Sequence, residues 1–437
     1  MSEVSPRAES ESSEPGTMLA PEQGSNNGLP ACRFCDSLLR HTFVDLGTSP
    51  LCESYRTADE LREVEMFYPL RVYLCANCFL VQLEEFVSPG AIFSEYAYFS
   101  SFSDSWLQHC SSYVDKMIER FHLNKETSVV EVASNDGYLL QYFAQRGVPV
   151  LGIEPAANIA EAAMNKGIPT RVEFFGDVTA QALVAEGKHA DLIVGNNVLA
   201  QVPDVNDFVE GLSVLLKPNG VITIEFPHLL CLMEQNQFDT IYHEHFSYFS
   251  FLTTEKIFDA HGLTIFDVEE LPTHGGSLRV YAKHADDQSK TVSSAVQELR
   301  RKEEAAGLAS VGAYGSFARR VERTKWNLLE FLITAKREGK VIAGYGAPGK
   351  GNTLLNYCGI RSDLLEYTVD RNPYKQGKFL PGTHIPILHP REIQERKPDF
   401  VLILPWNLKD EIIEQLSYIR QWGGRFVVPI PTVEVYP

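Results

Sequence analysis

The sequence lacks any apolar run long enough to span a bilayer, so no membrane partner is expected. It also lacks the excess of Lys and Arg that binding to a phosphate backbone requires, because 57 acidic and 39 basic side chains give a formal charge of −18. Nucleic acid is therefore not an expected partner. The N-terminus is rich in Ser and Glu and has no apolar segment, so we predict no secretory signal and expect a cytoplasmic location.

Aromatic residues are absent from residues 1–29, where Ser, Glu, Pro and Gly are frequent. Such a segment cannot bury enough apolar surface to offset the entropy lost on ordering, so we predict a disordered tail. The composition overall is that of a globular protein, with 44% hydrophobic and 22% charged residues. A length of 437 residues is too great for one core and predicts two or three domains.

Apolar runs alternate with helical stretches, which predicts an α/β protein with parallel sheets. The strand candidates of a central unit are "SVVEVA", "VPVLGIE", "DLIVGNN" and "GVITIEF", and "LTIFDVEEL" and "GGSLRVYAKH" near its end predict an antiparallel pair. The charged segment after this unit predicts solvated linker helices, and a smaller α/β unit follows. The expected domains are residues 30–87 around the paired cysteines, 88–287 for the central unit, 288–338 for the linker and 339–437 for the C-terminal unit.

Four of the eight cysteines form two CxxC pairs, Cys32 with Cys35 and Cys75 with Cys78. In a chain without an export signal, this pattern predicts a metal site rather than disulfides. Two CxxC turns supply four thiolates in a tetrahedral shell, which suits Zn²⁺. A closed shell leaves no position for water or substrate, so a structural role is expected. Cys52 lies between the pairs and is an alternative ligand.

The segment "SVVEVASNDGYLLQYF" predicts a strand, a tight loop and a helix. Only one of the three glycine positions of the common ExGxGxG loop is glycine here. The next strand ends in an acidic residue that can accept the hydroxyl groups of a ribose, and ligands bind at the carboxyl ends of such strands. The antiparallel pair favours S-adenosylmethionine (SAM) over NAD. The candidate cofactor-binding residues are Glu131, Ala133, Asn135, Asp136, Gly137, Glu154, Asp177 (for the adenine amino group), Asn196 and Asn197.

A second glycine-rich loop, "GYGAPGKG" at residues 344–351, matches GxGxxG after a predicted strand, and Asp370 ends the next strand. One interpretation is a dinucleotide site, and an NAD(P)-dependent oxidoreductase follows from it. The unit has only about 100 residues, however, which we take as too few for a full six-stranded fold. A phosphate cradle with Gly346 and Lys350 is the preferred interpretation, and a turn without a ligand is the third.

The CxxC pairs, "EVASNDGYLL", "YHEHFSYFS" and "GYGAPGKGNTLLNY", in this order, resemble the sugar C-methyltransferases. The resemblance covers residues 31–437. It implies a zinc-binding N-terminal domain, a class I SAM-dependent methyltransferase domain with a Rossmann-like sheet, and a C-terminal Rossmann-like α/β domain that helps to hold a sugar nucleotide. The implied substrate is a nucleotide-diphosphate 4-keto-6-deoxyhexose, methylated on a carbon beside the ketone, C-3 above all, in the biosynthesis of antibiotic sugars.

Methylation beside a ketone needs a base of near-neutral pKa and a donor for the enolate oxygen. "IYHEHFSYFS", residues 241–250, can supply both. The two histidines face one way if this segment is extended and diverge if it is helical. By the resemblance, the candidate catalytic residues are His245 as the base, Glu244, Tyr242 and Tyr96, and the substrate-binding residues are Tyr98, Gln201, His243, Gly346, Lys350 and Asp370.

Gln201 departs from the family, because relatives carry histidine in "NVLAHVPD" where this chain reads "NVLAQVPD". Glutamine cannot act as a base at neutral pH, so methyl transfer to oxygen or nitrogen stays open. A further alternative is a zinc-ribbon scaffold without activity, which the intact "YHEH" disfavours. We expect a monomer or a small homo-oligomer.

Overall fold

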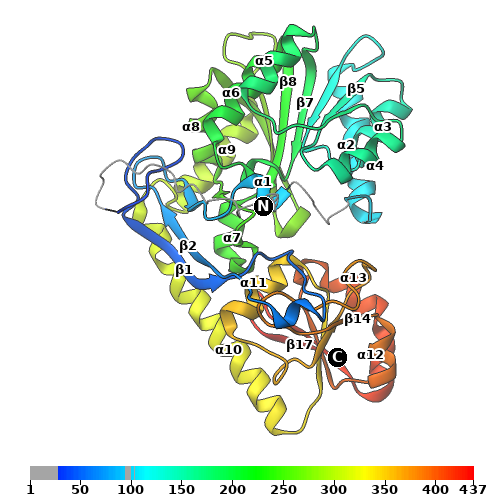
Figure 1. Cartoon of the computed structure of the whole chain (residues 1–437). Helices are drawn as coiled ribbons and strands as arrows, with labels where there is room; N and C mark the ends of the chain where they lie inside the picture. Colours follow the sequence, from blue (N-terminus) through cyan, green and yellow to red (C-terminus); the bar gives the residue numbers. More distant parts are fainter. Residues whose placement is uncertain (1–27, 94–99, 103) are drawn as a thin grey trace, which may run out of the picture.

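The structure is a computed structural model that describes residues 28–93, 100–102 and 104–437 (Figure 1). Most of the expected N-terminal tail, together with Tyr96 and Tyr98, lies outside the described residues. Three sheets organise the rest of the chain. No helix within the described ranges is long and apolar enough to cross a membrane.

The N-terminal sheet has four antiparallel strands, and its last strand comes from a distant part of the chain. Strand β3 pairs with β9, so that Val81 and Gln82 lie opposite Tyr248 and Ser247. The segment that follows "YHEH" is thereby fixed to the cysteine-containing unit. The strands are β1 (His41–Ser49), β2 (Tyr68–Leu74), β3 (Val81–Leu83) and β9 (Ser247–Tyr248), with η1 (Glu60–Arg62) and α1 (Pro89–Phe93) nearby.

The central sheet has seven strands in the order β10-β11-β8-β7-β4-β5-β6. The four expected strands are confirmed as β4 (Val129–Val132), β5 (Val150–Ile153), β7 (Ala190–Asn196) and β8 (Leu216–Pro227), and β6 (Thr170–Arg171) forms one edge. The expected antiparallel pair is also confirmed: β10 (Leu263–Leu271) pairs with β11 (Ser277–His284), which runs antiparallel to β8. This order and this single reversed strand give a class I methyltransferase sheet.

Both faces of the central sheet are covered because alternate residues of each buried strand point to opposite sides. Val129 packs under one set of helices and Val130 under the other. The first set is α2 (Asp104–Phe121), α3 (Leu140–Gln145) and α4 (Ala157–Asn165), and the second is α5 (Asp177–Ala185), α6 (Val205–Leu215), α8 (Phe251–Ala260) and α9 (Ser294–Ala305) (Figure 1). The intervening elements are η2 (Ser100–Phe102), η3 (Leu199–Gln201), α7 (Leu229–Glu234), η4 (Phe238–Thr240) and η5 (Thr273–Gly275).

The C-terminal sheet has six strands in the order β14-β13-β12-β15-β16-β17, and β17 alone among them is antiparallel to its neighbour. The C-terminal unit therefore holds six strands, and the prediction that about 100 residues are too few for them is wrong. Six fit because β14 has two residues and β17 has three. The elements are β12 (Ile342–Tyr345), α11 (Gly349–Cys358), β13 (Tyr367–Val369), β14 (Ile387–Leu388), α12 (Arg391–Arg396), β15 (Phe400–Ile403), η7 (Trp406–Leu408), α13 (Lys409–Gln415), η8 (Ser417–Trp422), β16 (Arg425–Val428) and β17 (Glu434–Tyr436).

The expected linker helices exist, but neither is solvated on all sides. α10 (Phe317–Arg337), preceded by η6 (Val311–Ser316), buries residues four and seven positions apart, such as Val321, Leu328 and Leu332, in the core shared by β1 and the C-terminal sheet. Figure 1 shows α10 lying along that unit. α9 buries Val296 and Leu299 against the central unit. Each helix therefore belongs to a folded core.

Candidate active site and zinc centre

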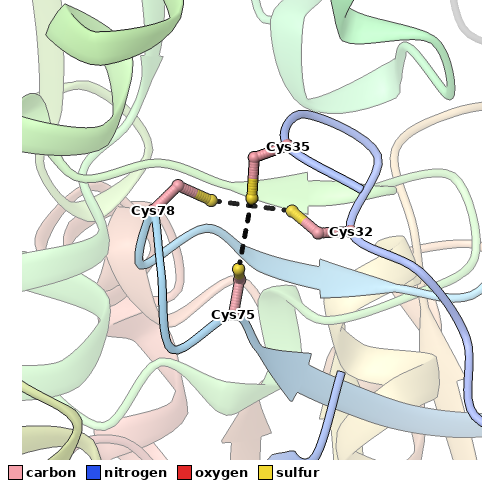
Figure 2. Close-up of side chains that lie close together, drawn as sticks. All are labelled: Cys32, Cys35, Cys75 and Cys78. Carbon is pink, nitrogen blue, oxygen red and sulfur yellow. Dashed lines mark hydrogen bonds between the residues drawn. The ribbon is translucent and has the colours of Figure 1, made fainter. Parts of the chain in front are cut away.

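The sulfur atoms of Cys32, Cys35, Cys75 and Cys78 converge on one point (Figure 2). All four lie within 4.8 Å of one another, and the Cys32–Cys78 and Cys35–Cys75 sulfur pairs are each 3.6 Å apart. A tetrahedral Zn²⁺ with Zn–S bonds of about 2.3 Å places its sulfur ligands about 3.8 Å apart. The donor set and its spacing therefore fit a structural zinc ion.

The two CxxC turns fold in the same way. Asp36 N–H donates to the Cys32 carbonyl over 2.9 Å, and Phe79 N–H donates to the Cys75 carbonyl over 3.0 Å. Asp36 and Phe79, each directly after the second cysteine, have φ angles of 58° and 66°. Non-glycine residues rarely adopt this left-handed conformation, so both turns carry backbone strain that the surrounding fold sustains.

Polar donors surround the thiol cluster. The Gln82 amide donates to Cys32 Sγ over 3.1 Å, and the Asn77 amide lies 3.5 Å from Cys35 Sγ. Such donors stabilise thiolates. Cys52 is not a member of the cluster, so the alternative that it replaces a ligand is wrong. Its thiol instead lies 3.4 Å from Glu244 Oε1 at the wall of a cavity.

A cavity of about 770 Å³ opens between the N-terminal, central and C-terminal units. This volume lies in the range of about 300–1,000 Å³ that is usual for small-molecule sites. The candidate residues on its wall are Ala133, Asn135, Glu154, Asn196, Asn197, Gln201, Tyr242, Glu244, His245 and Lys350. These residues lie between positions 133 and 350, so both the central unit and the start of the C-terminal unit contribute to the wall.

The loop after β4 forms one end of the cavity. Ala133 and Asn135 occupy two of the glycine positions of the common motif, yet their φ angles are 55° and 47°. The chain therefore keeps the left-handed turns of a glycine loop with other residues. Glu154 at the end of β5 fixes the loop, because its carboxylate accepts the Asn135 N–H over 3.0 Å and the Ala156 N–H over 2.9 Å. Burial raises the pKa of Glu154.

Four predicted cofactor residues are not on the cavity wall. Glu131 lies within β4 with its side chain fully buried, and burial raises its pKa well above the ordinary value. Asp136 pairs with Lys166 over 2.9 Å. Gly137 turns the chain at φ 75° against Ile168. Asp177 accepts a hydrogen bond from Gln181 within α5, and Glu173, Phe174 and Phe175 line the cavity instead.

The "YHEH" segment is a turn between η4 and β9, so its two histidines diverge. His245 lines the cavity and its Nδ1 lies 3.0 Å from the Thr240 carbonyl, which assigns the ring proton to Nδ1 and leaves Nε2 as a proton acceptor. Burial lowers the pKa of His245 to about 4, which is below the near-neutral value expected for the base, and the ring is therefore neutral at pH 7. The Tyr242 ring lies 4.2 Å from the His245 ring, centre to centre.

His243 does not reach the cavity. Its Nε2 lies 3.1 Å from the Pro69 carbonyl on β2, and its ring packs on Tyr68. The prediction that His243 binds substrate is therefore not supported, because its contacts join the turn to the N-terminal sheet. Glu244 is buried and lines the cavity next to Cys52.

The C-terminal unit contributes Lys350 from the first turn of α11. Its Nζ donates to Asn407 Oδ1 over 2.9 Å and lies 4.8 Å from the centre of the Trp406 ring. Burial lowers the pKa of Lys350, and the carboxylate of Asp239 opposes this effect. Gly346 and Asp370, two other predicted substrate contacts, are not on the wall.

The second glycine-rich loop is held by hydrogen bonds and close contacts with neighbouring residues. Asp370 accepts the N–H groups of Ala347 over 2.7 Å and Asn372 over 2.8 Å, so its carboxylate orders the loop rather than facing a ribose. Tyr55 from the N-terminal unit donates to the Ala347 carbonyl over 2.6 Å. A Cβ atom on Gly349 would lie 2.8 Å from Cys52 Sγ. This packing argues against the dinucleotide interpretation.

Sequence reasoning missed several wall residues. These are Trp106, His274 and Asn407, which all line the cavity. Lys375 lines it too, and its basic, turn-rich stretch "KQGKFLPGTHIPI" at residues 375–387 is the sequence signal that points to the cavity. His274 precedes two glycines in the link between β10 and β11, and its φ of 54° gives that link its turn.

The sheet order and the cavity at the carboxyl ends of its strands define a SAM-dependent methyltransferase. Three family models match the chain: a putative zinc binding domain at residues 32–93, a methyltransferase domain at 105–268 and a C-methyltransferase C-terminal domain at 272–431. The C-methyltransferase NovU of Streptomyces niveus is 37% identical over 407 residues, which are 93% of this chain and 97% of the relative. The chain therefore belongs to the C-methyltransferase family and is a SAM-dependent C-methyltransferase.

Two further similarities cover less of the chain. A ubiquinone biosynthesis O-methyltransferase of Bartonella tribocorum is 30% identical over 102 residues, 22% of this chain and 39% of that protein. The structure of magnesium protoporphyrin IX methyltransferase from Synechocystis with bound SAM matches 40% of this chain and 78% of its own, at 17% identity and a TM-score of 0.32.

Proposed function

We propose that the enzyme methylates the carbon beside the ketone, C-3, of a nucleotide-diphosphate 4-keto-6-deoxyhexose by way of an enolate. The observation that carries the proposal is His245: a buried, neutral imidazole on the cavity wall whose Nδ1 is held by the Thr240 carbonyl. Its Nε2 accepts the C-3 proton while the electron pair of the broken C–H bond moves toward the ketone oxygen. A positioned base of this kind contributes about 10²–10⁴-fold in rate.

SAM, when bound, supplies an electrophilic methyl group. The polar groups for holding it are grouped at one end of the cavity: the backbone of the loop at Ala133 and Asn135, the Glu154 carboxylate for ribose hydroxyls, and Asn196 and Asn197. The Oδ1 atoms of both Asn196 and Asn197 are buried without a partner among the described residues. Such atoms favour a polar ligand, because an unpaired buried acceptor is costly.

The sugar nucleotide is assigned to the other end, where Lys350 and Lys375 bring positive charge to a cavity that otherwise carries carboxylates. Lys350 at the start of α11 adds its charge to the positive end of a helix, a combination that suits a diphosphate. Gln201 and Tyr242 on the wall supply hydrogen bonds to the sugar. The side chain of Gln201 takes no proton in this scheme, so its difference from relatives does not remove the base.

Product analysis tests the proposal. The enzyme is incubated with SAM carrying a ¹³C-labelled methyl group and a series of nucleotide-diphosphate 4-keto-6-deoxyhexoses, and the product is examined by NMR. We expect the label to couple to C-3 through a carbon–carbon bond. A labelled methyl group on oxygen or nitrogen would contradict the proposal and return the O- or N-methyl alternatives.

A further inference from the structure

His274 enters the cavity from the link between β10 and β11, and no expectation from the sequence included it. The centre of its ring lies 5.4 Å from the centre of the Trp106 ring, and the positive charge of Lys350 acts on it. The charge of Lys350 lowers the pKa of both His245 and His274, and all three residues line the cavity, which places them in one region of it. This region holds the base of the proposed reaction, and the inference below rests on that function.

The orientation of the His274 ring follows from its neighbour Asn197. The Asn197 amide nitrogen lies 3.0 Å from His274 Nε2. An amide NH₂ group only donates, so Nε2 is the acceptor and the ring proton is on Nδ1. No hydrogen bond within the described residues engages Nδ1. Burial and then the charge of Lys350 lower the pKa of His274 to about 4, which keeps the ring neutral at pH 7.

Backbone strain shows that the fold maintains this arrangement. His274 and Asn197 have φ angles of 54° and 55°, so both members of the pair are in the left-handed region. Such residues persist only where the surrounding structure enforces them, and they are concentrated at functional sites. The Gly275 that follows His274 has no room for a side chain, because a Cβ atom there would lie 2.7 Å from Trp406 and 2.9 Å from Gln237.

One buried residue, Glu225, supports both members of the pair. Its backbone carbonyl accepts the Asn197 N–H over 2.7 Å, and its carboxylate Oε1 accepts the hydroxyl of Thr273, the residue before His274, over 2.7 Å. Glu225 Oε2 in turn pairs with Arg279 over 2.6 Å, directly across the sheet, and lies 3.0 Å from His109 Nε2. Glu225 is fully buried, and these partners fix the position from which His274 faces the cavity.

We propose that His274 is a further catalytic residue, whose Nδ1–H donates a hydrogen bond to the enolate oxygen formed when His245 takes the C-3 proton. The C–H bond breaks, its proton goes to His245 Nε2, its electron pair forms the carbon–carbon double bond, and the carbonyl pair moves to oxygen. A neutral imidazole placed against this oxygen stabilises the charge as it develops. His274 does not change its own protonation in the step.

The test uses exchange of the C-3 proton with deuterated water, followed by NMR without SAM, so that it reads enolate formation alone. His274→Gly and His274→Asn both suit the left-handed backbone. Each is expected to lower the exchange rate about 10²–10³-fold, with unchanged substrate dissociation constant and melting temperature. Free imidazole is expected to restore exchange in His274→Gly, where the ring has left a space.

The matched control is His122→Gly, because His122 has the same φ of 54° but is exposed and does not line the cavity. It should exchange like the wild type. Unchanged exchange in both His274 variants, or a loss explained by weaker substrate binding or a lower melting temperature, would overturn the role of His274. Absence of exchange in the wild type itself would instead contradict the proposed function, so the two failures are distinguishable.

Discussion

Replacing Glu303 by Gln tests how the fold supports the segment that carries the "YHEH" turn. Glu303 on α9 is fully buried and contacts both ends of residues 228–251. Its Oε1 lies 2.7 Å from His228 Nε2 and accepts the Phe251 N–H over 2.6 Å, and its Oε2 accepts the Leu252 N–H over 2.9 Å. Glu303→Gln keeps the size of the side chain and removes its charge.

The magnitude follows from the pKa of His228. Burial by itself would lower this pKa, but the hydrogen bonds to Cys231 and Glu303 and the Glu303 charge raise it from 6.5 to about 9. Because a pKa difference of one unit corresponds to about 1.4 kcal/mol, the protonated form of His228 stabilises the folded state by about 3 kcal/mol. This folded-state pKa is raised, so the stabilisation is complete below about pH 6.5 and is lost as the pH rises through about 9.

The assay is urea unfolding of the zinc-loaded protein between pH 6.5 and 9.5, followed by tryptophan fluorescence. The wild-type free energy of unfolding should fall by up to about 3 kcal/mol over this range. Glu303→Gln should be about 3 kcal/mol less stable at pH 6.5 and should lose most of the pH dependence, whereas Glu304→Gln, one residue along and exposed, should behave like the wild type. Equal pH dependence in Glu303→Gln and the wild type would refute the reasoning.

Three further predictions concern the metal and the cavity. Cys75→Ser should abolish stoichiometric zinc and methyl transfer together, because β3 follows the second CxxC turn and pairs with β9 beside the "YHEH" turn; full activity in a zinc-free variant would contradict this link. In a pH–rate profile, kcat/KM should be constant from pH 6 to 8 with its acid limb near 4, since burial lowers the pKa of His245 to about 4; an acid limb near 6.5 would argue for a different base. Lys350→Met should raise KM for the sugar nucleotide about 10–100-fold and leave SAM affinity in calorimetry unchanged, and the opposite pattern would move Lys350 to the cofactor side.

The sequence allowed the strands and the metal ligands to be predicted because both depend on local patterns. Buried parallel strands read as short apolar runs, as in "DLIVGNN", and two CxxC turns specify a four-sulfur shell at any separation in the chain. The side on which α10 packs was missed because its charged residues dominate the composition while its apolar stripe is narrow.

Site residues were harder to predict, since their roles depend on where the backbone turns. His243 and His245 are two positions apart, and only the turn decides that one contacts Pro69 and the other the cavity. Asp177 lies after β6, but it begins α5, and its side chain forms a hydrogen bond within that helix. His274 carries no motif, because it is brought to the cavity by a left-handed turn that two glycines and a buried carboxylate support.

The most direct test of the account compares two histidines that lie two positions apart in the chain. The wild type, His245→Gln and His243→Gln are incubated with a nucleotide-diphosphate 4-keto-6-deoxyhexose in deuterated water, and loss of the C-3 proton signal is followed by NMR. The wild type and His243→Gln, whose histidine lies outside the cavity, should exchange this proton, and His245→Gln should be slower by about 10²–10⁴-fold. Exchange at the wild-type rate in His245→Gln would contradict the central claim that His245 is the base.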